Sequence, residues 1–312
     1  MKTVFSGGPA LRRVYTDVTV SGIAEIAGED PVFSDTVPSD TEALFTTWGM
    51  RSYTAPYIKE NFPRLKYIFY GAGTVQSFAR PFLKNGVRVF SAWQANGVPV
   101  AEFTAAQIIL CGKRYFDVFT GARGVPHGNY GLKVGVIGLG VIGKLVCKML
   151  GQYKIDVYAY DKFLPDEVFG ALGVKRAALE EIFSECDVIS NHLANNPQTK
   201  GILNAALISR MKSDAYFINT GRGAQVDNDA LYNALCESPL RTALLDVTYP
   251  EPLPPEHKLR TLKNVIISPH IAGSLGCEVS RMGEYMCEEF GRVLNGEPPL
   301  YEVTEEMLEV MA

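Results

Sequence analysis

The chain lacks the features that mark several specialised classes of protein. None of its 312 residues belongs to an apolar run of about 18 residues, the length that spans a bilayer. A basic surplus is also missing, since 34 acidic side chains outnumber 30 basic ones and the formal net charge is -4. We therefore expect no nucleic-acid or membrane partner, and a small-molecule ligand instead. The opening MKTVFSGGPALRRVYTD has no apolar core of signal-peptide length, so we expect a cytoplasmic protein.

Cysteine is scarce and dispersed. None of the six cysteines has the CxxC spacing that is typical of zinc sites and redox motifs. We expect buried free thiols, with neither a disulfide framework nor a metal site. The six are Cys111, Cys147, Cys186, Cys236, Cys277 and Cys287.

The composition is that of a folded globular protein, with 47% apolar and 21% charged residues. A chain of this length exceeds the range in which one core keeps growing, which predicts two domains. In the first hundred residues, four apolar segments predict strand cores of a small α/β domain with a parallel sheet. They are VTVSGIAEIA at 18–27, EALFTTW at 42–48, LKYIFY at 65–70 and VRVFSA at 87–92.

From Val100 the apolar residues follow a helical period, and we place the domain boundary there. The following region predicts six strands separated mostly by helices, the pattern of a doubly wound dinucleotide fold. These strands are 133–138, 155–160, 187–191, 215–219, 242–246 and 264–268. A long amphipathic helix should follow, with one apolar stripe made of Leu275, Val279, Met282, Met286, Phe290 and Val293.

A strand, a glycine turn and a helix run from Lys133 to Asp161. Gly138, Gly140 and Gly143 have the spacing GxGxxG, which permits a tight turn, close approach of a pyrophosphate, and close packing of helix on strand. The helix N-terminus favours the diphosphate anion. The next strand, IDVYAY, ends at Asp161, whose carboxylate can bind the ribose hydroxyls and would repel a 2′-phosphate. We expect NAD (NADH) rather than NADP.

Three polar side chains each follow a predicted strand, where open α/β sheets bind their ligands. Arg222 lies in FINTGRGAQVD, Glu251 in LLDVTYPEPLP and His270 in IISPHIAG. Arg222 can bind a carboxylate bidentately and polarise a neighbouring carbonyl. His270 would act as general acid in reduction and as base in oxidation, with Glu251 orienting the imidazole. This set predicts hydride exchange at a 2-oxo or 2-hydroxy acid.

The contexts of the four histidines separate His270 from the others. His127 lies in a glycine-rich loop and His257 in the polar stretch PPEHKLR, so we expect both to be solvated. His192 follows the strand DVISN and borders the expected cofactor site. Only His270 both follows an apolar strand and precedes a turn of small residues.

With these motifs the chain resembles the D-isomer-specific 2-hydroxyacid dehydrogenase family. The matching segments occur in order and run through most of the chain. They are PVAEFTAAQIIL at 99–110, GLGVIG at 138–143, NHLANNPQTKGILN at 191–204, INTGRG at 218–223, DVTYPEP at 246–252 and SPHIAG at 268–273. The resemblance implies a Rossmann NAD-binding domain, residues 100–273, and a smaller flavodoxin-like α/β substrate domain, residues 1–99 and 274–312, with a cleft between them.

The resemblance also implies roles for individual residues. Arg222, Glu251 and His270 would be the catalytic triad of an NAD-dependent enzyme that interconverts a small 2-oxo acid and its D-2-hydroxy acid. Besides the glycine turn and Asp161, the cofactor would contact Val141, Ile142, Leu193, Thr220, Asp246, Ala272 and Gly273. Members of the family are commonly dimers, so we expect a homodimer.

One segment departs from the family pattern. The family has a glycine turn followed by two acidic positions, whereas YGAGTVQSFARP has Val75 and Phe78 there. The backbone amides of Ala72 and Gly73 would still bind the substrate carboxylate, beside an unusual side-chain pocket. Trp48 is either a wall of that pocket or a core residue.

Two other functions share this fold. An NAD(H)-sensing binding protein of the corepressor type keeps a similar triad, but the short tail after the long helix offers no extension for recruiting partners. A formate dehydrogenase relative would pair its histidine with an amide, whereas Glu251 is a carboxylate.

Overall fold

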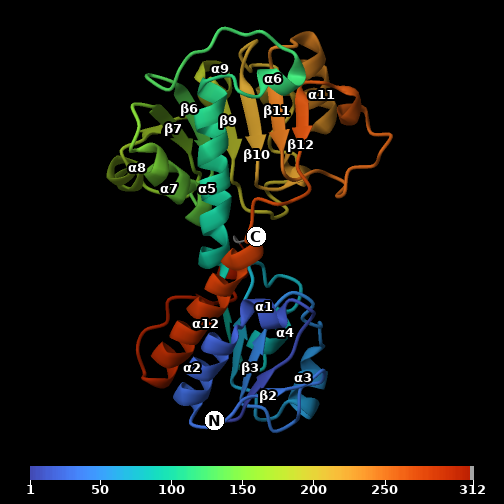
Figure 1. Cartoon of the computed structure of the whole chain (residues 1–312), viewed down its shortest axis with the longest axis vertical. Helices are drawn as coiled ribbons and strands as arrows, with labels where there is room; N and C mark the ends of the chain where they lie inside the picture. The colour runs from blue at the N-terminus through green and yellow to red at the C-terminus, as the bar shows by residue number, and fades with distance from the viewer. Residues whose placement is uncertain (310–312) are drawn as a thin grey trace. The chain divides into compact units, whose positions relative to one another are not determined.

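The computed structural model describes residues 1–309, which divide into two compact units (Figure 1). Unit 1 comprises Met1–Gly97 and the chain from Ser274 onward, and unit 2 comprises Val98–Gly273. The predicted divisions at 99–100 and 273–274 fall beside these boundaries. Each unit has its own sheet and its own core.

Unit 2 contains a seven-stranded sheet in the order β12-β11-β10-β9-β6-β7-β8, with every strand pair parallel. The order reverses between β6 and β9, as in a Rossmann domain. The strands are β6 (Lys133–Ile137), β7 (Asp156–Tyr160), β8 (Lys175–Arg176), β9 (Val188–Asn191), β10 (Tyr216–Asn219), β11 (Thr242–Leu245) and β12 (Val265–Ile267). Six of them were predicted, and β8 was missed because its two exposed residues carry no apolar pattern.

Alternate residues of the unit 2 strands enter two apolar clusters, one on each face of the sheet. Ile137 belongs to one cluster and Val136 to the other. Helices cover both faces because a parallel sheet must be buried on both. They are α5 (Trp93–Gly112), α6 (Asp117–Thr120), α7 (Val141–Leu150), α8 (Asp166–Leu172), α9 (Leu179–Glu185), α10 (Ala205–Ile208) and α11 (Asn228–Glu237), with the 3₁₀ turns η1 (Gly223–Gln225) and η2 (Lys258–Thr261).

Unit 1 contains a six-stranded sheet in the order β13-β5-β4-β3-β1-β2. Its five parallel strands have the flavodoxin order, and β13 adds antiparallel to β5 at the edge. The strands are β1 (Thr3–Phe5), β2 (Val32–Phe33), β3 (Ala43–Thr46), β4 (Tyr67–Tyr70), β5 (Arg88–Ser91) and β13 (Glu302–Val303). The predicted fold class, two α/β domains of Rossmann and flavodoxin-like type, is confirmed.

One predicted strand of unit 1 is wrong: the segment 18–27 lies in helix α2 (Asp17–Ala27). The Thr16 side chain caps its start by accepting from Thr19 N–H, and Gly28 ends it in the left-handed conformation. Its buried residues Thr19, Ile23 and Ala27 recur every fourth position, which is a helical period. The other helices are α1 (Leu11–Val14), α3 (Ala55–Asn61), α4 (Ala79–Leu83), α12 (Val279–Leu294) and the 3₁₀ turns η3 (Gly276–Glu278) and η4 (Met307–Glu309).

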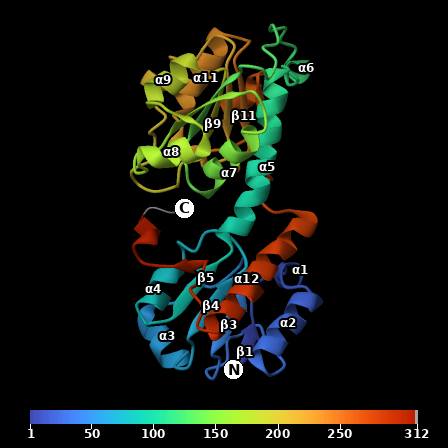
Figure 2. The ribbon, with the colours of Figure 1, turned by 90° about the vertical axis from the view of Figure 1, so that its left-hand side faces the viewer.

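The predicted amphipathic helix is α12, which lies against α2 in unit 1 (Figure 2). It begins at Val279, so the prediction is wrong for Leu275, which lies before the helix and is half exposed. Met282, Met286 and Phe290 are fully buried, as the pattern predicted.

The cysteines are free thiols, but not all are buried. Cys236 in α11 and Cys277 in η3 are exposed. Among residues 1–309, no helix is long and apolar enough to cross a membrane.

Candidate active site

The glycine turn joins β6 to α7 at the point where the strand order of unit 2 reverses. Gly138 has a φ of 91°, and a Cβ atom there would lie 2.9 Å from the carbonyl of His192. A Cβ on Gly143 would lie 2.0 Å from the Gly138 oxygen, whereas Gly140 faces open space. No side chain caps α7 at Gly140, so the first N–H groups of the helix are available to an anion. The turn fits a dinucleotide diphosphate.

Asp161 stabilises this turn with its own carboxylate. Its Oδ2 atom accepts a hydrogen bond from Leu139 N–H at 2.9 Å, and its Oδ1 atom accepts from the N–H groups of Phe163 at 2.9 Å and Leu164 at 3.2 Å. Oδ2 accepts only one of these bonds, so its second lone pair is available to a ribose hydroxyl.

Thr220 follows β10 and lies in a buried chain of hydrogen bonds. Its hydroxyl oxygen is 3.0 Å from that of Thr104 and 3.4 Å from Nδ1 of His192, whose Nε2 is 2.9 Å from the Ser190 hydroxyl. Burial lowers the pKa of His192 to about 3, so this imidazole is neutral at physiological pH. His192 is therefore enclosed within unit 2 and is hydrogen-bonded to Thr220 rather than to solvent.

Arg222 begins the turn after β10 and is half-buried. Its Nη1 atom donates to the Gly221 carbonyl at 2.7 Å, and its backbone N–H donates to Gln225 Oε1 at 3.2 Å. Burial lowers the pKa of the guanidinium, and the negative charge of Glu251 opposes that shift. A Cβ atom on the next residue, Gly223, would lie 2.0 Å from the carbonyl carbon of Thr248. Only glycine lets the Arg222 turn pack so closely on the loop that carries Glu251.

Glu251 and His270 form a direct pair. One carboxylate oxygen of Glu251 is hydrogen-bonded to Nδ1 of His270, and the other accepts from Thr248 N–H at 3.4 Å. The His270 side chain remains 48% exposed, so its second ring nitrogen can reach a ligand. The structure thus brings the three predicted catalytic side chains together in unit 2.

Asp246 at the end of β11 builds the turn that carries His270. Its buried carboxylate accepts from Ser268 Oγ at 2.6 Å and from the N–H groups of Ile271 and Ala272, each at 2.9 Å. Within this turn His270 has a φ of 55°, a value that is uncommon for a residue other than glycine. Asp246, predicted to contact the cofactor, therefore holds the turn that carries the His270 imidazole.

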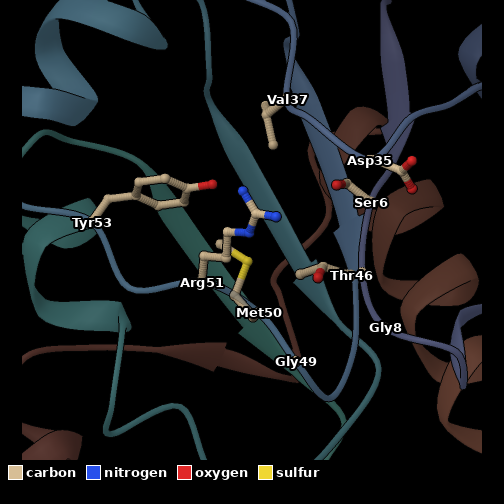
Figure 3. Close-up of a pocket in the computed structure, with 10 residues that line it drawn as sticks. Ser6, Gly8, Asp35, Val37, Thr46, Gly49, Met50, Arg51 and Tyr53 are labelled. Carbon is tan, nitrogen blue, oxygen red and sulfur yellow. The ribbon is translucent and has the colours of Figure 1, made fainter.

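Unit 1 has a pocket of about 400 Å³ at the carboxyl ends of β1 and β3, the point where its own strand order reverses (Figure 3). Open α/β sheets bind ligands at such a point. The lining residues are Ser6, Gly7, Gly8, Asp35, Val37, Thr46, Gly49, Met50, Arg51 and Tyr53. Arg51 was not predicted from the sequence, although Gly7 and Gly8 follow β1, and Gly49 precedes Arg51 after β3. Trp48 is not in the lining and is 41% exposed, so it is not a core residue.

The predicted carboxylate-binding turn follows β4 in unit 1. Ala72 N–H donates to the Tyr70 carbonyl at 2.8 Å, so it is already paired. The N–H groups of Gly73 and Thr74 have no acceptor among residues 1–309. Val75 and Phe78, at the family's acidic positions, are buried in the core, so they do not form an unusual side-chain pocket.

Comparison with known proteins agrees with this geometry. Residues 118–272 match the family model of the D-isomer specific 2-hydroxyacid dehydrogenase NAD binding domain. The chain is 33% identical over 226 residues to D-3-phosphoglycerate dehydrogenase of Methanocaldococcus jannaschii, covering 69% of this chain and 42% of that protein. It is 33% identical over 224 residues to glyoxylate reductase of Thermofilum pendens, covering 68% of this chain and 66% of that protein. The matches thus span less than two thirds of these relatives.

The whole fold is also found in solved structures. A phosphoglycerate oxidoreductase from Rhizobium etli superposes with a TM-score of 0.79 at 22% identity, covering 99% of this chain and all of that one. At that identity the likeness shows the fold alone. With the NAD-binding match, the glycine turn identifies the cofactor as NAD(H). The chain belongs to the D-isomer-specific 2-hydroxyacid dehydrogenase family.

Proposed function

We propose that this protein is an NAD(H)-dependent oxidoreductase that interconverts a small 2-oxo acid and its D-2-hydroxy acid. The observation that carries the proposal is the hydrogen bond between His270 and Glu251 beside the Arg222 turn, in the unit that binds NAD. A corepressor-type NAD sensor would keep a similar triad, so turnover in the assay below separates the two functions.

The three side chains have separable roles. Nδ1 of His270 is engaged by Glu251, which leaves Nε2 to donate a proton to the carbonyl oxygen in reduction and to accept it in oxidation. Arg222, always protonated, binds the substrate carboxylate and polarises the carbonyl. NADH, when bound, supplies the hydride. In unit 1, the backbone N–H groups of Gly73 and Thr74 are candidate donors to a carboxylate.

The cofactor role extends to the residues around the glycine turn and the strand ends. The N–H groups of Val141 and Ile142 lie in the first turn of helix α7 and would donate to the diphosphate. Leu193, Thr220, Ala272 and Gly273 follow β9, β10 and β12, at the carboxyl edge of the sheet where the nicotinamide half binds.

The test is a substrate panel. Purified protein is assayed with NADH and with NADPH against glyoxylate, pyruvate, hydroxypyruvate, phosphohydroxypyruvate and bulkier 2-oxo acids. We expect oxidation of NADH, in preference to NADPH, by at least one of them. NADH binding without turnover across the panel would refute the proposed activity.

We also propose that the protein is a homodimer. Helix α6 and the residues before it expose Tyr115, Val118 and Phe119, and the ring of Tyr115 contacts that of Phe119. Such a group of large apolar side chains is covered in a stable protein, and a second copy of this chain is the expected partner. Sedimentation equilibrium should give twice the mass of one chain for the wild type and the mass of a single chain for the double variant V118D/F119D.

A further inference from the structure

The C-terminal segment returns to the turn that carries Gly73 and Thr74. After β13, η4 brings Leu308 into the core of unit 1, where its side chain is 2% exposed. Leu308 belongs to the same apolar cluster as Ala72, Val75 and Phe78. Two members of that cluster, Val75 and Phe78, are themselves buried, so Leu308 lies in an apolar environment.

Polar contacts attach the same segment to the residues after the turn. The Leu308 carbonyl accepts from Gln76 Nε2 at 2.7 Å and from Arg80 Nη2 at 3.1 Å. Arg80 also pairs with Glu309 at 3.0 Å and donates through Nη1 to Gln76 Oε1 at 2.8 Å. These contacts are local to unit 1 and link positions more than 225 residues apart in sequence.

Gly73 and Thr74 are held between two fixed points. On one side, the Ser91 hydroxyl of β5 lies 2.9 Å from the Ala72 carbonyl and 2.5 Å from the Gly73 carbonyl. On the other side, Val75 is fully buried, and its carbonyl accepts from Phe78 N–H at 3.1 Å. Leu308 belongs to the apolar cluster that contains Val75 and Phe78.

We propose that the C-terminal segment 304–309 is a positioning element for the carboxylate-binding turn. By closing the core over Val75 and Phe78, it sets the direction of the Gly73 and Thr74 N–H groups and thereby the affinity for the 2-oxo acid. This inference rests on the proposed function, since it assigns these N–H groups to the substrate. A small displacement of such donors weakens binding steeply.

The first test compares Leu308→Ala with the volume-conserving Leu308→Met. The alanine variant should raise the KM for the 2-oxo acid about tenfold, which corresponds to about 1.4 kcal/mol, and leave kcat and the KM for NADH unchanged. Leu308→Met should restore the wild-type KM. Arg80→Met, which leaves the core filled, should raise the same KM to a smaller extent.

The matched control is Arg292→Met, which removes hydrogen bonds to the Pro298 carbonyl in the same unit. This variant should leave the KM for the 2-oxo acid unchanged. An unchanged KM in Leu308→Ala, or a fall in kcat that follows the loss of folded protein, would overturn the inference.

A second measurement does not depend on activity. Hydrogen exchange of Leu308→Ala should accelerate at the amides of residues 71–78 and remain at the wild-type rate at 46–53. Uniform acceleration, or none, would overturn the inference. If the wild-type protein reduces no 2-oxo acid, the proposed function fails, and local acceleration would still establish that the segment holds the turn.

Discussion

His270 pairs with Glu251 across 19 residues of sequence, and it does so from a left-handed backbone conformation. Such a conformation costs of order 1 kcal/mol or more for a residue with a Cβ atom and persists where neighbouring contacts maintain it. Here the contacts come from Asp246. Its carbonyl accepts from His270 N–H, and its carboxylate accepts from the Ser268 hydroxyl and from Ile271 N–H. The His270–Glu251 pair is therefore preorganised by a third, buried acid.

Replacing His270 with alanine should lower kcat about 10²- to 10⁴-fold, because the proton donor to the carbonyl oxygen is lost. NADH binding, measured by fluorescence titration, should be retained. The exposed His127 provides the matched control, and its alanine variant should keep full activity. Loss of NADH binding in His270→Ala would show that the residue supports the cofactor site instead.

Replacing Asp246 with asparagine should disorder the His270 turn. An amide cannot accept from both Ser268 and the N–H groups of Ile271 and Ala272, so we expect a loss of about 1.5–3 kcal/mol in unfolding free energy and a lower kcat. Denaturant titration and steady-state kinetics check this. Asp229→Asn, at an exposed position, should change neither quantity. Wild-type kcat in Asp246→Asn would mean that the turn does not depend on this carboxylate.

Asp161→Ser should reduce the preference for NADH over NADPH by about tenfold or more, because the negative charge that repels a 2′-phosphate is removed. NADH itself should also bind more weakly, since Leu139 N–H loses its acceptor. The dissociation constants of both cofactors measure the effect. Asp166→Ser, in an exposed ion pair with Arg176, is the control and should preserve the preference.

Arg51 lines the unit 1 pocket, and its guanidinium has no ion-pair partner among residues 1–309. We expect Arg51→Met to lower kcat/KM for 2-oxo acids with a second anionic group by at least about tenfold more than for glyoxylate. Parallel kinetics with glyoxylate and phosphohydroxypyruvate test this. An equal loss of kcat/KM for both substrates would show that the pocket does not bind the second anionic group.

His192 should make the protein less stable in acid. Because burial lowers its pKa to about 3, the folded protein keeps this imidazole neutral, whereas the unfolded chain binds a proton below its ordinary pKa of 6.5. The contribution of His192 to the unfolding free energy is complete above pH 6.5. It is lost as the pH falls toward 3, at up to about 1.4 kcal/mol per pH unit. Urea titrations at several pH values give the unfolding free energy as a function of pH. This free energy should fall less steeply with decreasing pH in His192→Asn than in the wild type, and equally steeply in His127→Asn.

Much of unit 2 could be predicted from local sequence. Its buried strands are apolar runs bounded by turn residues, and the glycine spacing imposes its own geometry, so the strand, turn and helix from Lys133 to Asp161 were predicted correctly. Segment 18–27 was assigned wrongly because short apolar runs with β-branched residues suit a strand as well as a buried helix face. There, the capping by Thr16 and Gly28 and the packing against α12 decide for the helix.

The order of residues along the chain was sufficient to predict that Arg222, Glu251 and His270 lie at one edge of the unit 2 sheet, because each follows a strand whose carboxyl end must meet the others there. It could not assign Asp246 to the His270 turn, or bring Leu308 into one apolar cluster with Val75 and Phe78. These relationships join residues that are distant in sequence, and no local pattern encodes them. Only the packing of the folded sheets decides which buried polar groups and apolar side chains become neighbours.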